Sequence, residues 1–432
     1  MWYFLYNALL VLAAPVILLV LLSKKRCRRG VWRRLGLLPS SLCGTEEPVI
    51  WVHAVSLGEA VAVVPLVQEL RKRYPHDRLI VSTVTETGRE AVEQRLKGIA
   101  EHCYAPLDFP WVVSRVVGFL NPRLFLFVET ELWPNLLRCL DRRGVPCAMV
   151  NGRLSSRSFE GYRRVRPLIA QVLSHVRLFL MQSERDAERV TALGADPARV
   201  VRVGNLKFDQ PAGQATATKA INREALGIHD DVPLLVAGST HPIEEEALLV
   251  GYGRVLTQWP KAVLVLAPRH IERAPELETV VRSRGYQVRR RSRMNGAAAR
   301  PIGDSQVIIL DTRGELAQVY GLATVAYVGG TLAPVGGHNL LEPARWGKPV
   351  LFGPHTDHCE ESASVLLDAG AGVRVENGEA FGRQVAQLLR DGSARDRMGQ
   401  AALRVMAENR GALERSLDLL EGLIRRTREC RP

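Results

Sequence analysis

Several patterns that mark well-known protein classes are missing from this sequence. The seven cysteines among 432 residues are scattered and form no Cys-x-x-Cys pair, which excludes a disulfide scaffold and suits a reduced compartment. No Gly-x-Gly-x-x-Gly opens the first helix and no Gly-x-x-x-x-Gly-Lys-Ser/Thr occurs, which weighs against nicotinamide dehydrogenases and P-loop phosphotransferases. Charged residues make up only 24% and apolar residues 47%, so the chain has enough apolar material for a large core and is not globally disordered.

The first 45 residues contain no acidic side chain, although the whole chain carries 45 Asp and Glu. Residues 2–22 are uncharged and would form a helix of about 31 Å, close to the thickness of a bilayer core. Seven basic residues lie between positions 24 and 34, after this run instead of before it, which argues against a cleaved signal peptide. By the positive-inside rule, the basic side and the rest of the chain should face the cytoplasm. We therefore expect a membrane anchor with Trp2, Tyr3 and Tyr6 in an interfacial belt. A spanning helix and an interface-lying helix both remain open, because Asn7 and Pro15 interrupt the apolar run.

From residue 48 onward, short apolar runs alternate with helical patterns in two series. Runs without polar alternation, separated by helices, are typical of a parallel sheet covered on both faces. The sequence therefore predicts an α/β fold of two Rossmann-like domains. The predicted order is a membrane anchor helix with its basic flank (1–34), a first Rossmann-like domain (35–209), a linker (210–232), a second Rossmann-like domain (233–392) and C-terminal helices that pack back across both domains (393–432).

Glycines concentrate between a strand and a helix of the second domain. Gly329-Gly330 and Gly336-Gly337 flank one loop, and Glu342 follows in the next helix. Such glycines allow backbone N–H groups to approach a phosphate, and a Glu one turn into the helix can accept hydrogen bonds from a ribose. The pattern predicts a nucleotide site, with a tight turn as the competing interpretation.

Charged residues also follow several other predicted strands. Arg269, after one strand of the second domain, could bind a phosphate with two hydrogen bonds. In the first domain, Glu59 and Glu129 each follow a strand, and Lys207 lies near the linker. Because open α/β sheets bind ligands at the carboxyl ends of their strands, we expect these residues to line a cleft between the two domains. Each has a plain alternative as a helix cap or a surface charge.

Taken together, these strings resemble the Kdo (3-deoxy-D-manno-octulosonic acid) transferases of lipid A assembly, which are GT-B glycosyltransferases that use CMP-Kdo. The resemblance runs nearly end to end, and the Glu-Thr-Glu-Leu-Trp-Pro-Asn string is the most specific to the family. It is carried by residues 53–59 (HAVSLGE), 129–135 (ETELWPN), 151–155 (NGRLS), 204–209 (GNLKFD), 268–270 (PRH) and 336–342 (GGHNLLE).

The resemblance implies an inverting transfer of Kdo from CMP-Kdo to the lipid A precursor (lipid IVA) at the cytoplasmic face of the inner membrane, with release of CMP. It implies Glu59 as the general base, with Glu129 and Lys207 as stabilisers of the transition state. It places CMP at Pro268, Arg269, Arg313, Gly314, Glu315, Asn339, Leu340, Leu341 and Glu342.

The expected partners are CMP-Kdo, the lipid A precursor and the membrane, and we expect neither a metal nor another cofactor. The alternative function is transfer from a UDP-sugar to a lipid by another membrane-associated GT-B enzyme. A non-catalytic nucleotide-binding module would not need Glu59 and Glu129. An RNA-binding role is disfavoured because over half of the net charge of +13 belongs to the anchor flank.

Overall fold

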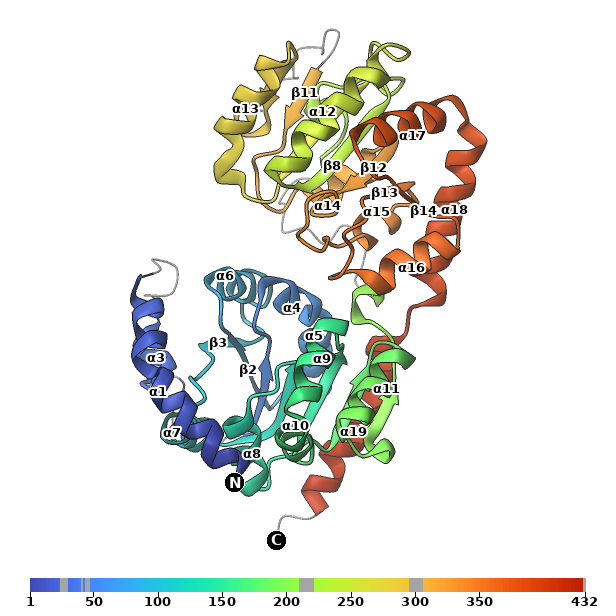
Figure 1. The fold of residues 1–432 in the computed structure, drawn as a ribbon. Coiled ribbons are helices and arrows are strands. Elements are labelled where there is room, and N and C mark those ends of the chain that lie inside the picture. Colours follow the sequence, from blue (N-terminus) through green and yellow to red (C-terminus); the bar gives the residue numbers. More distant parts are fainter. Residues whose placement is uncertain (24–29, 40–41, 43–46, 210–220, 295–305, 430–432) are drawn as a thin grey trace. The chain divides into compact units, whose positions relative to one another are not determined.

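The computed structural model describes residues 1–23, 30–39, 42, 47–209, 221–294 and 306–429. Its internal contacts divide the chain into two compact units. Unit 1 comprises residues 1–210 and 409–432, and unit 2 comprises residues 211–408. Each unit is built on its own parallel sheet (Figure 1).

The sheet of unit 1 has seven strands in the order β3-β2-β1-β4-β5-β6-β7, and every pair of neighbours is parallel. β1 lies inside the sheet, with β2 and β3 added on one side of it and β4 to β7 added on the other. The strands are β1 (Val49–His53), β2 (Arg78–Thr83), β3 (Glu101–Tyr104), β4 (Pro122–Val128), β5 (Cys147–Gly152), β6 (Leu178–Met181) and β7 (Val200–Arg202).

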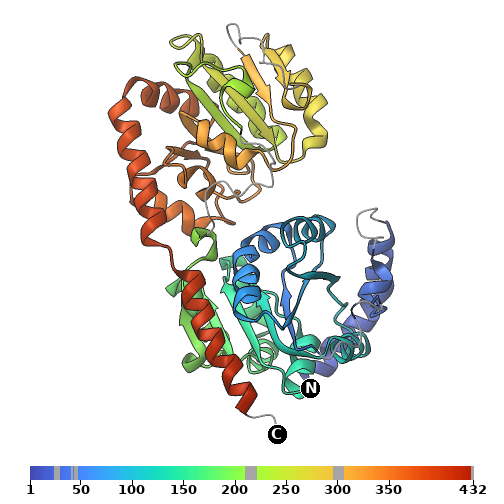
Figure 2. The same ribbon diagram turned by 180° about the vertical axis from the view of Figure 1, so that it is seen from behind.

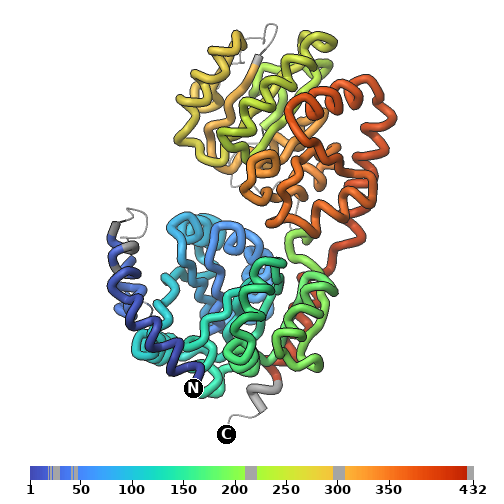
Figure 3. The backbone as a smooth tube through the Cα atoms, viewed as in Figure 1, coloured from blue at the N-terminus to red at the C-terminus, as the bar shows by residue number. Residues whose placement is uncertain are grey.

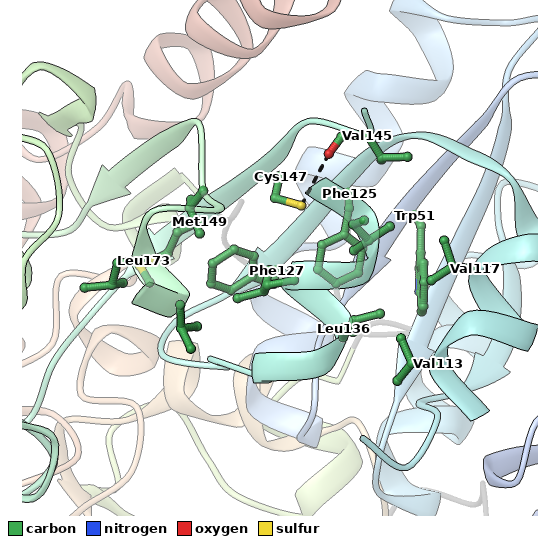
Figure 4. Close-up of a cluster of buried hydrophobic side chains, with 14 of the residues drawn as sticks. Trp51, Val113, Val117, Phe125, Phe127, Leu136, Val145, Cys147, Met149 and Leu173 are labelled. Carbon is green, nitrogen blue, oxygen red and sulfur yellow. Dashed lines mark hydrogen bonds between the residues drawn. The ribbon is translucent and has the colours of Figure 1, made fainter. Parts of the chain in front are cut away.

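Side chains from the two faces of this sheet enter two separate cores. On β1, Trp51 enters one core while Ile50 and Val52 enter the other, and all three are fully buried. Figure 4 shows the first core, where Trp51 meets Phe125 edge to face at a centroid distance of 4.9 Å. Burial on both faces explains why the strands lack polar alternation.

Helices cover both faces of the unit 1 sheet (Figures 1 and 2). They are α1 (Trp2–Ser23), α3 (Val31–Arg34), α4 (Leu57–Ala62), α5 (Val64–Arg73), α6 (Glu86–Arg95), α7 (Pro110–Leu120), α8 (Pro134–Arg142), α9 (Ser156–Arg164), α10 (Arg166–Leu173), α11 (Glu184–Leu193) and α19 (Ala412–Glu429), with short 3-10 turns at η2 (Pro197–Arg199) and η3 (Leu206–Asp209).

The last helix of unit 1, α19, comes from the C-terminal end of the chain and packs on α5 and η3 (Figure 3). The carboxylate of Asp209 in η3 accepts hydrogen bonds from the backbone N–H groups of Gly411 and Leu413, both at 2.7 Å. Asp209 therefore joins the end of the first sequence segment of unit 1 to the start of the second.

The sheet of unit 2 also has seven parallel strands, in the order β10-β11-β9-β8-β12-β13-β14. The strands are β8 (Leu234–Thr240), β9 (Val263–Pro268), β10 (Gln287–Arg290), β11 (Gln306–Ile309), β12 (Val325–Val328), β13 (Val350–Phe352) and β14 (Gly372–Arg374). The helices and 3-10 turns of this unit are η4 (Glu224–Leu226), α12 (Pro242–Leu256), η5 (Ile271–Arg273), α13 (Ala274–Ser283), η6 (Arg291–Arg293), α14 (Leu316–Leu322), α15 (Leu341–Ala344), α16 (Glu360–Asp368), α17 (Gly378–Arg390) and α18 (Gly392–Glu408).

The predicted fold class, two Rossmann-like parallel-sheet domains, is confirmed. The helical pattern of residues 59–74 predicts one helix, but the structure has two, α4 and α5, because Pro65 has no N–H to continue the hydrogen-bond ladder and its ring disfavours an unbroken helix. The edge strands β3 (EHCY) and β14 (GVR) were not predicted, since neither contains a continuous apolar run. Residues 210–220 of the predicted linker lie outside the described residues, and its remaining part, residues 221–232, contains the 3-10 turn η4 (Glu224–Leu226).

The predicted N-terminal helix is present as α1, but two of its aromatic residues do not lie where the sequence suggested. The Tyr3 hydroxyl donates to the carbonyl of Pro134 at 3.1 Å, and that of Tyr6 donates to Asp108 at 2.9 Å. Tyr3 is only 5% exposed. The expectation of a membrane belt is therefore wrong for Tyr3 and Tyr6, which are held by unit 1. Within the part of the chain that the structure covers, no helix is both long and apolar enough to span a bilayer.

Candidate active site

Three of the residues predicted from the sequence lie at one edge of the unit 1 sheet. Glu59 lies in the first turn of α4, the helix that follows β1, Glu129 directly follows β4, and Lys207 lies in η3 after β7. β1 and β4 are adjacent and parallel, so their carboxyl ends meet at the same edge. The structure therefore brings the two glutamates together, as the strand pattern predicted.

Glu59 is 8% exposed, and its carboxylate is held on both oxygens. Oε1 accepts from the Ser56 hydroxyl at 2.7 Å, and Oε2 accepts from the Val55 N–H at 2.9 Å. Ser56 in turn caps α4 by accepting from the N–H of Glu59. Burial, reinforced by the nearby charges of Glu129 and Glu131, raises the pKa of Glu59 to about 7, against the effect of its two hydrogen bonds.

Glu129 adopts a left-handed backbone conformation with φ of 55°, which non-glycine residues rarely adopt. Its N–H donates to Val150 on β5, and its carboxylate lies 3.6 Å from the Nζ atom of Lys207. A strained backbone that the surrounding structure maintains is typical of functional sites. The ion pair puts the positive charge of Lys207 at the same edge as the two glutamates.

A third acidic residue, Glu131, completes this edge. It accepts from the indole N–H of Trp133 at 2.9 Å, and burial together with the charge of Glu129 raises its pKa. Trp133 packs edge to face against His53, whose ring is fully buried. Burial lowers the pKa of His53 to about 3, so this histidine is neutral. Its ring contacts the loop that carries Glu129 and Glu131 through Trp133. His53 and Glu131 both belong to the strings that carry the family resemblance, but the sequence did not indicate that they lie close together.

A network of buried amides holds the turn that carries Lys207. Gln182 donates to the carbonyl of Asn151 at 2.8 Å and accepts from Asn205 at 2.9 Å. The side chain of Asn205 then accepts from the N–H of Lys207 at 3.0 Å. These partners come from three separate strand ends, so only the folded sheet brings them together.

In unit 2, Pro268 ends β9 and Arg269 follows it at the carboxyl edge of the sheet. The N–H of Arg269 donates to the carbonyl of Thr240, at the end of the neighbouring strand β8, at 2.9 Å. The Arg269 side chain is exposed. Its backbone is therefore fixed while its guanidinium remains accessible to an anion.

Histidines surround this strand end. The Nε2 atoms of His241 and His338 are 2.9 Å apart, and the ring of His270 meets that of His241 edge to face. Burial, with the charge of Arg269 as the next cause, lowers the pKa of His338 to about 3. One imidazole must donate and the other accept, so the two rings form a neutral hydrogen-bonded pair.

Residues 313–315 follow β11, the strand on the other side of β9. Gly314 has φ of 83°, which explains the glycine at this turn. The carboxylate of Glu315 is paired with Arg291, with contacts of 3.1 and 3.2 Å. Arg313 is exposed and lies 3.8 Å from Glu272. The backbone of this turn and the Arg313 side chain are thus the groups open to a ligand.

Residues 339–342 lead into α15. The side chain of Asn339 accepts from the N–H of Leu341 at 3.2 Å and donates to Glu342 at 3.5 Å. Leu340 and Leu341 are fully buried in the core. Asn339 and Glu342, by contrast, are partly exposed and carry polar side chains.

The N–H groups of the first glycine pair have a different partner from the one that the sequence suggested. The side chain of Glu244, fully buried in α12, accepts from the N–H groups of Gly330, Leu332 and Ala333 and from the Tyr327 hydroxyl. The expectation that these N–H groups face a phosphate is therefore wrong for Gly330. The sequence gave no indication of Glu244, because it lies more than 80 residues from the loop that it shapes.

The predicted residues of each unit thus share the carboxyl edge of their own sheet. A family model described as "3-Deoxy-D-manno-octulosonic-acid transferase (kdotransferase)" matches residues 29–210. The 3-deoxy-D-manno-octulosonic acid transferase of Haemophilus influenzae is 35% identical over 99% of this chain and 100% of its own length. This chain belongs to the Kdo transferase family. It is accordingly a glycosyltransferase, as the motifs predicted.

Other relatives agree with this assignment. The 3-deoxy-D-manno-octulosonic acid transferase of Bordetella pertussis is 32% identical to this transferase over 94% of the chain and 96% of its own length. Among solved structures, the UDP-GlcNAc 2-epimerase from Neisseria meningitidis bound to UDP-GlcNAc covers 87% of the chain and all of its own with a TM-score of 0.62, at 13% identity. That likeness shows a shared two-domain α/β fold.

The segment from His355 to Glu361 contains residue types that ligate zinc, but contiguous residues at the start of a helix more often form its cap and first turn. In the structure, α16 begins within it at Glu360. Over the ranges that the structure covers, no three His, Cys, Asp or Glu side chains are grouped so that they would hold a metal ion.

Proposed function

We propose that this transferase moves Kdo from CMP-Kdo to a sugar hydroxyl of the lipid A precursor and releases CMP. Membership of the Kdo transferase family supports the sugar that is transferred. The donor and the lipid acceptor come from the resemblance of the motifs. Unit 1, with its acidic edge, would bind the acceptor, and unit 2, with Arg269 at its strand ends, would bind the nucleotide.

The observation that carries the proposal is the environment of Glu59. A carboxylate that is almost fully buried at a strand end, with its pKa near 7, can accept a proton from a hydroxyl at neutral pH. Its two hydrogen bonds, from Ser56 and Val55, fix its orientation. An acid kept only to cap a helix would gain nothing from this burial or from the like charges of Glu129 and Glu131.

In the proposed reaction, Glu59 removes the proton from the acceptor hydroxyl as its oxygen attacks the anomeric carbon of Kdo. The bond from that carbon to the CMP phosphate breaks, and the configuration inverts because attack and departure occur on opposite faces. Lys207 and Glu129, held 3.6 Å apart, would stabilise charge in the oxocarbenium-like transition state.

On the donor side, we assign the CMP phosphate to Arg269 and Arg313, whose exposed guanidinium groups follow adjacent strands. Pro268, Gly314 and the backbone from Asn339 to Leu341 would surround the nucleotide. Glu342 is placed to accept hydrogen bonds from ribose hydroxyls, and Glu315, paired with Arg291, would hold its own turn in shape. Basic side chains supply the positive charge, so the proposal includes no metal or other cofactor.

We further propose that the enzyme works at the cytoplasmic face of the inner membrane, because its lipid acceptor is embedded there. The uncharged run of residues 2–22, followed by basic residues, supports this location. Attachment confines enzyme and acceptor to one surface, which raises their effective concentration.

Incubation of the purified enzyme with CMP-Kdo and a detergent-dispersed lipid A precursor tests the function directly. Mass spectrometry of the lipid should show the mass of one or more added Kdo units, together with free CMP. Product formed from a UDP-sugar, and none from CMP-Kdo, would instead establish the alternative donor. Hydrolysis of neither donor in the presence of the lipid would point to a binding module.

A further inference from the structure

The first helix is attached to unit 1 at its N-terminal end by polar contacts. The hydroxyl of Tyr6 donates to Asp108 at 2.9 Å, and the side-chain oxygen of Asn7 accepts from Asn135 at 2.6 Å. Tyr3 donates to the carbonyl of Pro134, and its ring lies under the guanidinium of Arg138. The start of α1 is therefore part of the globular unit (Figure 1).

The chain that follows α1 returns to the same unit. An added Cβ on Gly30 would lie 2.4 Å from the ring of Tyr104, so this backbone packs directly on β3. The guanidinium of Arg34, in α3, lies 4.6 Å from the centre of the Tyr104 ring and donates to the carbonyl of Val84. Both flanks of α1 are thus fixed to unit 1.

These attachments conflict with a helix that crosses a bilayer. Twenty-two residues of helix measure about 33 Å, comparable to the hydrocarbon core. If α1 crossed the membrane, Tyr6 and Asn7 would lie on the opposite side from Asp108 and Asn135, and their hydrogen bonds would be impossible. The helix instead runs along the margin of unit 1 (Figures 1 and 2).

One face of α1 remains exposed and is apolar. Its residues recur at intervals of three and four, which places them on a single stripe of the helix. Leu12 is 76% exposed, and the other members are Leu5, Leu9, Val16 and Leu19. Large apolar side chains exposed in one continuous row are typical of a binding surface.

Two elements near α1 also expose large aromatic side chains (Figure 1). Trp32 on α3 is 71% exposed and Trp111 on α7 is 61% exposed. The turn after α3 packs on α7, since an added Cβ on Gly36 would lie 3.4 Å from Arg115. On α7 the guanidinium of Arg115 covers the ring of Phe119, which is itself partly exposed. The elements α3 and α7 therefore expose aromatic and basic side chains.

We infer that α1 lies flat in the headgroup region of an anionic bilayer, with α3 and α7 contributing aromatic and basic contacts. Tryptophan prefers the membrane interface, and basic residues near an anionic surface stabilise binding to it. A protein partner would not require the exposed cations Arg33 and Arg115 beside an apolar row. This inference deepens the proposed function, because it specifies how the enzyme meets the membrane that holds its acceptor.

Protease accessibility of an N-terminal tag tests the orientation of α1. A cleavable tag placed before Met1 should be cut in inside-out membrane vesicles and protected in intact spheroplasts, because the helix start lies on the same side as unit 1. The opposite pattern of cleavage would establish a spanning helix and overturn the inference.

Binding to vesicles tests the surface itself. Leu12→Asp should weaken binding to phosphatidylglycerol vesicles at least tenfold, and Trp111→Ser should weaken it several-fold, because both positions face the lipid. Ile243→Asp, at an equally exposed apolar position in unit 2, is the matched control and should bind as the wild type does. The inference would be contradicted if all variants bound phosphatidylglycerol vesicles equally, or if the wild type bound neutral phosphatidylcholine vesicles equally well. It would also be contradicted if the wild type formed dimers without lipid and Leu12→Asp dissociated them, because the apolar stripe would then be a protein interface.

Activity with detergent-dispersed acceptor separates this inference from the proposed function. Leu12→Asp should transfer Kdo at the wild-type rate when the acceptor is in detergent, since unit 1 keeps its acidic edge. If the wild type fails to transfer Kdo in detergent while its vesicle binding depends on Leu12 as expected, the proposed function is contradicted and the inferred membrane-binding surface is supported.

Discussion

At the scale of single residues, the chemistry depends on how the fold changes the proton affinity of Glu59. Burial is the largest cause of its raised pKa, and the charge of Glu129 is the next. Both effects disfavour the ionised form, so the base is populated only as the pH rises through about 7. The same burial that makes Glu59 a stronger base thus limits the pH range in which it acts.

The pH dependence of kcat/KM should show this directly. We expect activity to rise with pH along a limb centred near 7, where Glu59 loses its proton. Glu129→Gln removes a negative charge that raises this pKa, so its limb should shift to lower pH even though its maximal rate falls. A limb that stays in place in Glu129→Gln would show that another group titrates.

Arg269 allows a separate test of the donor side. Arg269→Ala should raise KM for CMP-Kdo about tenfold or more, because a charge-assisted contact to a phosphate contributes about 1.5–3 kcal/mol. Since the Arg269 side chain is exposed, the variant should fold normally, and its thermal unfolding is the control. An unchanged KM for the donor would remove Arg269 from the phosphate site.

Some of these residues were predictable from the sequence and others were not. Glu59 and Arg269 follow runs of strand residues, and the carboxyl end of a parallel strand is where α/β proteins place ligands. Glu244 acts through a partner that is distant in the sequence, Gly330. No local pattern marks such residues, because only the folded sheet creates the contact.

At the scale of secondary-structure elements, Asp108 links α1 to α8. Its carboxylate accepts from the N–H groups of Asn135 and Leu136, the first turn of α8, and from the hydroxyl of Tyr6. The loop with Glu129 and Trp133 leads directly into this turn, so Asp108 couples the position of α1 to that of the acidic loop.

Asp108→Asn should therefore destabilise unit 1. An amide has only one acceptor oxygen for three donors, and an unsatisfied buried donor costs about 1–3 kcal/mol. Thermal unfolding measures this loss. The control is Asp391→Asn, where an exposed aspartate caps α18 and an asparagine caps equally well. If both variants unfold at the same temperature, the carboxylate of Asp108 does not hold the two helices together.

The elements themselves followed from local rules where those rules are strong. The short apolar runs that alternate with helical patterns from residue 48 onward form strands of the two sheets, because a strand buried on both faces is continuously apolar. The break at Pro65 was missed, since the apolar periodicity continues through it. β3 was missed because its first residue, Glu101, is exposed and paired with Arg78, which gives an edge strand a polar start.

At the scale of the whole molecule, the chain leaves unit 1 and returns to it. The sequence shows one helical region from residue 393 onward, but the structure assigns α18 to unit 2 and α19 to unit 1. Both helices have helical periodicity, and nothing local tells which sheet each one covers. The decisive contacts are those between Asp209 and the start of α19.

Leu420 provides a test of this return. It is fully buried on α19 and belongs to the core of unit 1, so Leu420→Ala should lower the stability of unit 1 by about 2–5 kcal/mol. Affinity for CMP, which we assign to unit 2, should stay unchanged, as titration calorimetry would show. Loss of CMP affinity with unit 1 intact would mean that α19 serves the nucleotide site.

Replacement of Glu59 by glutamine shows whether this carboxylate is the base for Kdo transfer. Glu59→Gln can keep both hydrogen bonds, since its amide oxygen accepts from Val55 and its amide nitrogen donates to Ser56. We predict unchanged affinity for CMP and a fall in kcat of about 10²–10⁴-fold at pH 8. Turnover by Glu59→Gln close to that of the wild type would exclude Glu59 as the general base.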